Sequence, residues 1–172
     1  MSKTPYAVLR MIEFYKGVPS DVNHTVKVLK YCETIEQLEN VGCETREIIE
    51  AAAVMHDIAC PLCREKYGSA DGKYQEKEGP ALAETLMREL GYRDEVIERV
   101  CYLVGHHHTY TNVDGIDYRI LLEADYLVNA DEMSLSYESI RAANRNIFKT
   151  ESGKALLRAL YPSAFKTGGD LD

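Results

Sequence analysis

Histidine and aspartate side chains stand at four places where the surrounding residues are mostly apolar. His56 and Asp57 are adjacent in the run AAAVMHDIA, which is apolar almost throughout. A buried imidazole or carboxylate costs free energy unless it is hydrogen-bonded, paired with a charge or bound to a metal. Packing alone therefore explains the His-Asp pair poorly, and we interpret the pair as part of a polar site.

His24 and Asp125 are predicted to lie on apolar faces of two other helices. The residues that share a face with His24 at helical spacing are Val28, Tyr31 and Ile35. Those that share a face with Asp125 are Ile120, Leu121, Ala124, Leu127 and Val128. A single core histidine, or a single aspartate that accepts hydrogen bonds, is compatible with a structural role, so each position alone leaves both interpretations open.

Three consecutive histidines follow an apolar stripe over residues 97–104. If the helix continues past Gly105, His107 and His108 fall on that stripe and His106 points elsewhere. Gly105 can also end the helix sooner, which would undo this assignment. Histidines at a helix C-terminus also compensate the helix dipole, so a purely electrostatic role stays open.

Together these four places hold all five histidines of the chain and two aspartates on apolar faces. A structural explanation would have to hold at every place at once, so we favour a metal site. Imidazole and carboxylate ligands suit a divalent cation such as Fe, Mn, Co, Ni or Zn, with Mg as a further candidate. Such a cation lowers the pKa of bound water from ~15.7 toward ~7–9.

The elements that must position these residues are predicted to be helices, because almost every periodic stretch has a helical period. The predicted helices cover residues 21–40, 44–59, 78–90, 93–104 and 117–129, with one or two more over 137–161. Residues 60–76 are predicted to form a long loop, the kind of segment that is often functional. The fold class is therefore all-α. We expect a single domain over residues 1–172, with its core at about 20–130, C-terminal helices at 131–165 and a frayed tail from Lys166.

Composition excludes several classes of protein. The 172 residues carry a formal net charge of −8, which argues against a nucleic-acid-binding protein. No apolar run approaches the ~20 residues of a membrane span, and the N-terminus lacks the features of a secretory signal. Five cysteines without an export signal indicate reduced thiols and a cytoplasmic protein, and leave the role of the Cys60/Cys63 pair open. A homo-oligomer is compatible with this composition.

The order His, His-Asp, Asp on successive predicted helices resembles the HD-domain superfamily of metal-dependent phosphohydrolases. The resemblance covers roughly residues 20–130 and is carried by the segments DVNHTVKVL, AAAVMHDIA and LLEADYLVN. It implies a compact helical bundle. It also implies that one metal is coordinated by His24, His56, Asp57 and Asp125.

Some branches of this superfamily hold a second metal. The segment EGPALAETL resembles the His-Gly-Pro segment of the diadenosine-polyphosphate hydrolases, but Glu78 stands where that branch has histidine. His107 and His108 resemble the paired histidines of the cyclic-dinucleotide phosphodiesterases, although the Gly-Tyr-Pro motif of that branch is absent. We therefore expect one metal, with Glu78, His107 and His108 as the candidates for a second, weaker site.

The resemblance implies hydrolysis of a small phosphorylated metabolite, a nucleotide or a related phosphate ester. Asp57 is expected to orient the attacking water, and Lys27, one turn beyond His24, is a candidate catalytic cation. The candidates for binding the substrate phosphate are Arg64, Lys66, Lys73 and Lys77. Two alternatives stay open: a sensory or scaffold module that retains the fold without turnover, and a hydrolase that attacks a non-phosphate bond.

Overall fold

The computed structural model describes residues 2–166, and the regular elements within that range are all helices. Their bounds are α1 Thr4–Phe14, α2 Pro19–Leu38, α3 Cys43–Met55, α4 Cys60–Tyr67, α5 Gly72–Glu89, α6 Asp94–Val104, α7 Gly115–Glu132, α8 Tyr137–Asn146, α9 Glu151–Leu160 and α10 Pro162–Phe165. The all-α prediction is confirmed. Most of the tail that was expected to fray, residues 167–172, lies outside the described residues.

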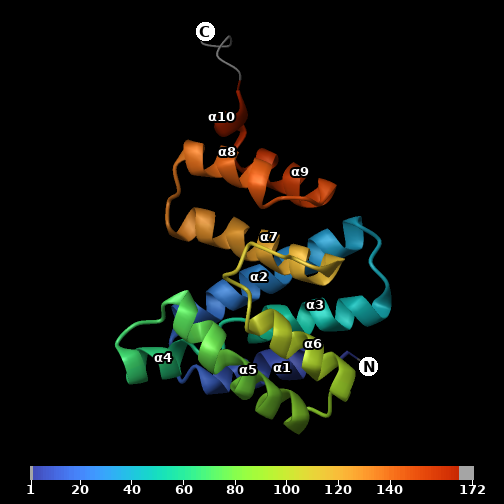
Figure 1. The fold of residues 1–172 in the computed structure, drawn as a ribbon, viewed down its shortest axis with the longest axis vertical. Coiled ribbons are helices and arrows are strands. Elements are labelled where there is room, and N and C mark those ends of the chain that lie inside the picture. The colour runs from blue at the N-terminus through green and yellow to red at the C-terminus, as the bar shows by residue number, and fades with distance from the viewer. Residues whose placement is uncertain (1, 167–172) are drawn as a thin grey trace.

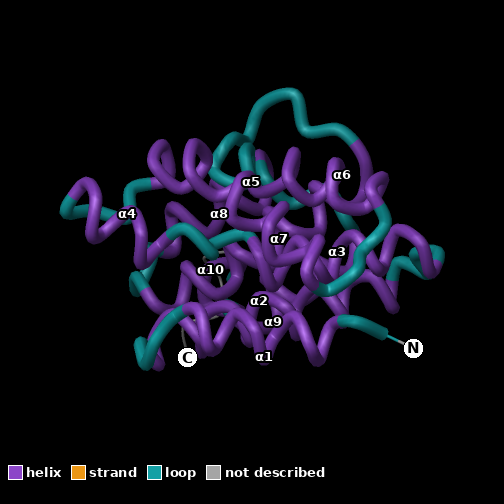
Figure 2. Tube along the Cα trace, turned by 90° about the horizontal axis from the view of Figure 1, so that it is seen from below, coloured by secondary structure: helices purple, strands orange, loops and turns teal. Residues whose placement is uncertain are grey.

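Helices α2 and α7 form the middle of the molecule (Figure 1). They pack against each other and against α3, which in turn packs on α1 and α6, while α5 packs on α6 and α4. Helices α8, α9 and α10 lie on the other side of α7 (Figure 1). Seen from below, the helices are joined by loops that run over the outside of the bundle (Figure 2). Residues 120–128 of α7 are all buried, as expected for a central helix.

The chain changes direction at the His-Asp pair. Helix α3 ends at Met55, four residues before the predicted end, and residues 56–59 form turns before α4. Two of these turns are closed by hydrogen bonds from the Ile58 amide to the Met55 carbonyl and from the Cys60 amide to the Asp57 carbonyl. His56 keeps a helical backbone conformation, with its amide bonded to the Ala52 carbonyl, and the chain leaves the regular helix after it.

The long loop predicted over residues 60–76 is wrong. Helix α4 occupies residues 60–67 and α5 begins at Gly72, so only residues 68–71 connect the two helices. Pro61 stands in the first turn of α4, where a missing amide hydrogen costs nothing. Gly68 ends α4 with a φ of 69°, a conformation that favours glycine.

Helix caps explain two other boundaries. The predicted segment 137–161 divides into α8 and α9, whose first turns are capped by Ser136 and Thr150. The Ser136 hydroxyl accepts a hydrogen bond from the Ser139 amide, and the Thr150 hydroxyl accepts one from the Gly153 amide.

Across the described chain, every helix is too short or too polar to cross a membrane.

Candidate metal centre

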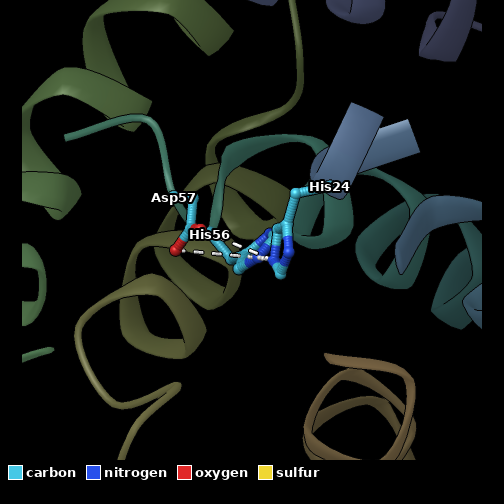
Figure 3. A group of neighbouring side chains, drawn as sticks. All are labelled: His24, His56 and Asp57. Atoms are coloured by element: carbon cyan, nitrogen blue, oxygen red, sulfur yellow. Dashed lines mark hydrogen bonds and ion pairs between the residues drawn. The ribbon is translucent and has the colours of Figure 1, made fainter. Parts of the chain in front are cut away.

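His24, His56 and Asp57 gather in the bundle with ligand atoms within 4.8 Å of one another, and Asp125 contacts both imidazoles. His24 comes from α2, His56 and Asp57 come from the turns after α3, and Asp125 comes from α7. The Nε2 atom of His24 lies 3.3 Å from Nε2 of His56 and 3.2 Å from Oδ1 of Asp125. Figure 3 shows His24, His56 and Asp57 pointing toward one another; Nε2 of His56 lies 3.7 Å from Oδ1 of Asp57. The side chains that the sequence separates by up to a hundred residues thus share a centre.

The orientation of the two imidazoles fits a cation at this centre. Nδ1 of His56 donates to the Ala53 carbonyl at 2.8 Å, and Nδ1 of His24 donates to Oε2 of Glu132 at 2.9 Å. Each ring therefore directs its Nε2 atom inward, toward the carboxylates of Asp57 and Asp125. A bound cation would take the place of the proton that Nε2 of His24 carries in the cation-free protein.

The ionisation of these groups agrees with a demand for positive charge. Burial alone would lower the pKa of His24, but the hydrogen bond with Asp125 and the charge of Asp57 outweigh it and raise the pKa to about 9. Burial lowers the pKa of His56, which is fully enclosed. Burial also opposes ionisation of Asp57, yet the surrounding histidines hold the pKa of its carboxyl below the usual range. Asp57 is therefore held in its ionised form, which attracts a cation or a proton to the centre.

His107 and His108 lie on the other side of Asp57. Helix α6 ends at Val104, and a turn brings these residues to the centre. The interpretation in which the helix continues through His107 and His108 is therefore wrong. His107 is fully buried, its Nδ1 donates to the Val104 carbonyl at 2.7 Å, and its Nε2 lies 3.3 Å from Oδ1 of Asp57 without a hydrogen bond. One ligand atom from each of Asp57, His107 and His108 can be chosen so that all lie within 4.8 Å of one another. His106 points elsewhere, with Nδ1 bonded to the Tyr102 carbonyl.

His108 is well suited to ligate a metal in its neutral form. Its Nε2 is buried and has no hydrogen-bond partner. Burial and the neighbouring His107 lower the pKa of His108 to about 4. A neutral ring with a free lone pair is the form in which histidine binds metals.

The structure places Glu78 away from this second group. Oε1 of Glu78 lies 2.9 Å from Nζ of Lys66 and accepts a hydrogen bond from the Tyr67 hydroxyl at 2.5 Å. Lys77 also approaches the same oxygen, at 4.0 Å. The carboxylate is thus engaged by residues of α4 and α5 instead of facing the histidines.

A pocket of about 270 Å³ opens beside His24 and Asp57. Its lining residues are Ser20, Asp21, His24, Asp57, Cys60, Arg64, Ala70, Gln75, Asn129 and Glu132. Of the four predicted phosphate-binding cations, only Arg64 belongs to this lining; Lys66 and Lys77 flank Glu78, and Lys73 lies over the Tyr74 ring. Arg64 forms a two-pronged ion pair with Asp21, at 2.5 and 3.0 Å.

Sequence reasoning missed three residues of the site. Glu132 fixes the ring of His24, and Asn129 donates to Oδ1 of Asp125 at 2.9 Å. They follow Asp125 by seven and four residues on α7, so helical spacing from that ligand could have found both. The third is Gln75 on α5, which lines the pocket. Lys27, predicted as a catalytic cation, donates to Oε1 of Glu132 at 2.9 Å.

Comparison with known proteins agrees with this geometry. A family model described as HD domain matches residues 21–130, about the region where the ligands lie. The crystal structure of a predicted HD superfamily hydrolase from an uncultured Thermotogales bacterium is similar, with a TM-score of 0.68 and 18% sequence identity. The match covers 95% of this chain and 86% of that chain, and at this identity it shows a shared fold. No curated protein matches the chain.

Proposed function

The chain belongs to the HD-domain family, and we propose that it hydrolyses a small phosphate ester, such as a nucleotide, at a divalent-cation centre. The observation that carries this proposal is the inward-facing pair of Nε2 atoms on His24 and His56, opposite the carboxylates of Asp57 and Asp125. These four residues would hold the cation. When bound, it would neutralise phosphoryl charge and acidify water.

The chain's own residues orient the centre. The Ala53 carbonyl and the Glu132 carboxylate each hold one imidazole ring in a fixed orientation, a contact that raises the basicity of a metal-binding histidine. Lys27 in turn holds Glu132, so we assign it a positioning role in place of the catalytic role expected from the sequence. Asp57 belongs to both groups of ligands and is partly exposed, which suits a carboxylate that also accepts a hydrogen from the attacking water.

Arg64 is the residue that we expect to contact the substrate phosphate. It lines the pocket beside Asp57, and its ion pair with Asp21 uses two of the five N–H donors of a guanidinium. The remaining donors are available to a phosphate oxygen. The pocket volume of about 270 Å³ lies just below the range of ligand sites, about 300–1,000 Å³, and this favours a small substrate over a polymer.

A substrate screen with a matched variant tests the proposal. We expect the protein to hydrolyse members of a panel of nucleotides, cyclic dinucleotides and phosphomonoesters in the presence of Mn, Co, Ni or Mg. Asp57→Asn should lower kcat by about a hundredfold or more. Loss of a residue that only orients a metal ligand costs about tenfold to a hundredfold, and loss of the ligand itself should cost more. Unchanged turnover by the variant would exclude this site. Silence of the metal-loaded protein across the panel would favour a sensory module.

Arg64→Ala provides a second test that concerns substrate binding. A lost charge-assisted hydrogen bond costs about 1.5–3 kcal/mol, so KM should rise by about tenfold to a hundredfold with a smaller change in kcat. Lys73→Ala is the matched control, because Lys73 carries the same charge but lies over Tyr74 outside the pocket lining. An equal effect of both substitutions, or none for Arg64→Ala, would contradict the assignment.

A further inference from the structure

We infer that Gln75, and not Glu78, supplies the oxygen ligand for a second cation on the His107–His108 side of Asp57. The inference rests on the proposed function in one respect only, that the centre binds divalent cations. It concerns a residue that the family resemblance does not indicate.

The packing of α5 places Gln75 against this part of the centre. A Cβ atom on Gly72 would lie 2.6 Å from the ring of His108, so the first turn of α5 contacts that histidine directly. A Cβ atom on Gly79 would lie 2.6 Å from Cγ1 of Val104 and 4.0 Å from Cβ of Ala59, which joins the turns after α3. Gln75 follows Gly72 by three residues and precedes Gly79 by four, so all three share one face of the helix. Gln75 also lines the pocket together with Asp57.

The amide of Gln75 is oriented with its oxygen free. Nε2 donates to the Ala70 carbonyl at 2.8 Å, which fixes the identity of the two amide atoms and turns Oε1 away from that carbonyl. The residue is 6% exposed, and Oε1 is buried without a hydrogen-bond partner. A buried amide oxygen without a donor is costly, and a cation satisfies it.

Another buried atom near Asp57 is in the same condition. Nε2 of His108 also lacks a hydrogen-bond partner, and Nε2 of His107 lies 3.3 Å from Oδ1 of Asp57. Ligand atoms of both histidines gather with Asp57. Gln75 Oε1, the two imidazole nitrogens and a carboxylate oxygen of Asp57 make a set of two oxygen and two nitrogen donors. Such a set suits Mn²⁺ and related divalent ions.

Glu78 lies at a different angle on α5. At about 100° per residue it stands about 100–120° from Gly72 and Gly79, the residues that contact the turns, and about 60° from Gln75. Its carboxylate would have to leave both Lys66 and Tyr67 to reach the histidines. A neutral amide in place of a carboxylate removes one negative charge from the second group, so this cation should bind more weakly than the one held by His24, His56, Asp57 and Asp125.

Metal titration of matched variants tests the inference without relying on activity. We would titrate the full chain with Mn²⁺ by competition against a chromophoric chelator and record the electron paramagnetic resonance spectrum of the loaded protein. The wild type should bind two ions per chain and show exchange coupling, because both groups include Asp57. Gln75→Leu should weaken the second ion by about tenfold to a hundredfold and abolish the coupling, with the first ion unaffected.

Two further variants make the result decisive. Glu78→Gln should leave both affinities unchanged, and Gln75→Glu, which keeps an oxygen at the same place, should retain or tighten the second ion. Loss of the second ion in Glu78→Gln with retention in Gln75→Leu would overturn the inference. A wild type that binds one ion would overturn it while leaving the proposed function intact, and a wild type that binds none would contradict both. Circular dichroism of each variant confirms that it is folded.

Discussion

His24, His56 and His107 each direct Nδ1 to a hydrogen-bond acceptor outside the centre, and for His24 that acceptor is the carboxylate of Glu132. A carboxylate in this position orients the ring and increases its basicity. Lys27 donates to the other oxygen of Glu132, so the carboxylate is itself held in place. This contact links a residue on the surface of α7 to the strength with which the centre binds a cation.

Replacing Glu132 by glutamine should therefore weaken the first cation by about tenfold to a hundredfold. The measurement is chelator competition with Mn²⁺ on the purified protein. Glu84→Gln serves as a control, since Glu84 pairs with Arg88 on the exposed side of α5. Equal affinities for Glu132→Gln and the wild type would show that Glu132 has no part in the centre.

Protons and cations should compete for Nε2 of His24. Because its pKa is raised to about 9 in the cation-free protein, this ring is protonated at neutral pH and must lose the proton when a cation binds. Cation affinity should thus increase with pH up to about 9, by about tenfold per unit, and about one proton should be released per cation at pH 7. Calorimetry in two buffers of different ionisation enthalpy measures that proton. An affinity independent of pH between 6.5 and 8.5 would contradict the assignment of His24.

At the scale of elements, the centre depends on turns that follow helices more than on the helices themselves. His56 and Asp57 follow α3, and His107 and His108 follow α6. Helix α5 packs against both turns through a face with two glycines, which allow its backbone to come close. The position of α5 is therefore coupled to the packing of both turns.

Gly79→Ala tests that close approach. The added Cβ would lie 2.6 Å from Cγ1 of Val104, and overpacking of this kind costs about 1–3 kcal/mol. We expect a fall of that size in the free energy of unfolding, measured by urea denaturation. Ala81→Ser, at an exposed position of the same helix, should change it by less than about 0.5 kcal/mol. Equal stabilities of Gly79→Ala and the wild type would show that α5 can move away from α6 at no cost.

The sequence was sufficient to predict the helices whose apolar faces are wide and regular. The prediction of helix boundaries failed at a proline, which can either end one helix or begin the next. The centres of α2, α3, α6 and α7 were predictable because each has residues buried at helical spacing. Pro61 was interpreted as the stop of one helix, but it stands in the first turn of the next, and proline is compatible with both. Helix α1 was not predicted at all.

The site was predictable in residue type and only partly in geometry. Each of His24, His56, Asp57 and Asp125 is a polar residue among apolar neighbours, and this pattern can be recognised from the sequence alone. Glu132 has no such environment in the sequence, since its place beside His24 arises from the packing of α7 on α2. The Gly-Pro segment pointed to Glu78, but only the rotation of α5 decides which of its polar residues faces the histidines.

At the scale of the molecule, the centre joins segments that are far apart in the chain. Its first group of ligands comes from α2, α7 and the turns after α3, and the second adds the turn after α6. In the absence of a cation, the protonated ring of His24 supplies the positive charge that faces the carboxylates of Asp57 and Asp125. A cation bound only by the folded chain should stabilise the whole bundle.

Removal of the cation should therefore lower the thermal stability. At a free cation concentration a hundredfold above the Kd, binding adds about 2.7 kcal/mol to the free energy of unfolding. For a domain of this size that corresponds to a rise in Tm of about 5–10 °C. Scanning calorimetry of the protein with a chelator and with Mn²⁺ measures this difference in Tm. The Asp57→Asn variant should show a much smaller rise in Tm on addition of Mn²⁺. A Tm unaffected by Mn²⁺ in the wild type would contradict a cation that links these helices.

The most direct measurement is an anomalous difference map from crystals of the Mn²⁺-loaded protein. The account predicts a strong peak within about 2.0–2.4 Å of Nε2 of both His24 and His56 and of a carboxylate oxygen of both Asp57 and Asp125. A map whose strong peaks all lie away from these four side chains would contradict it.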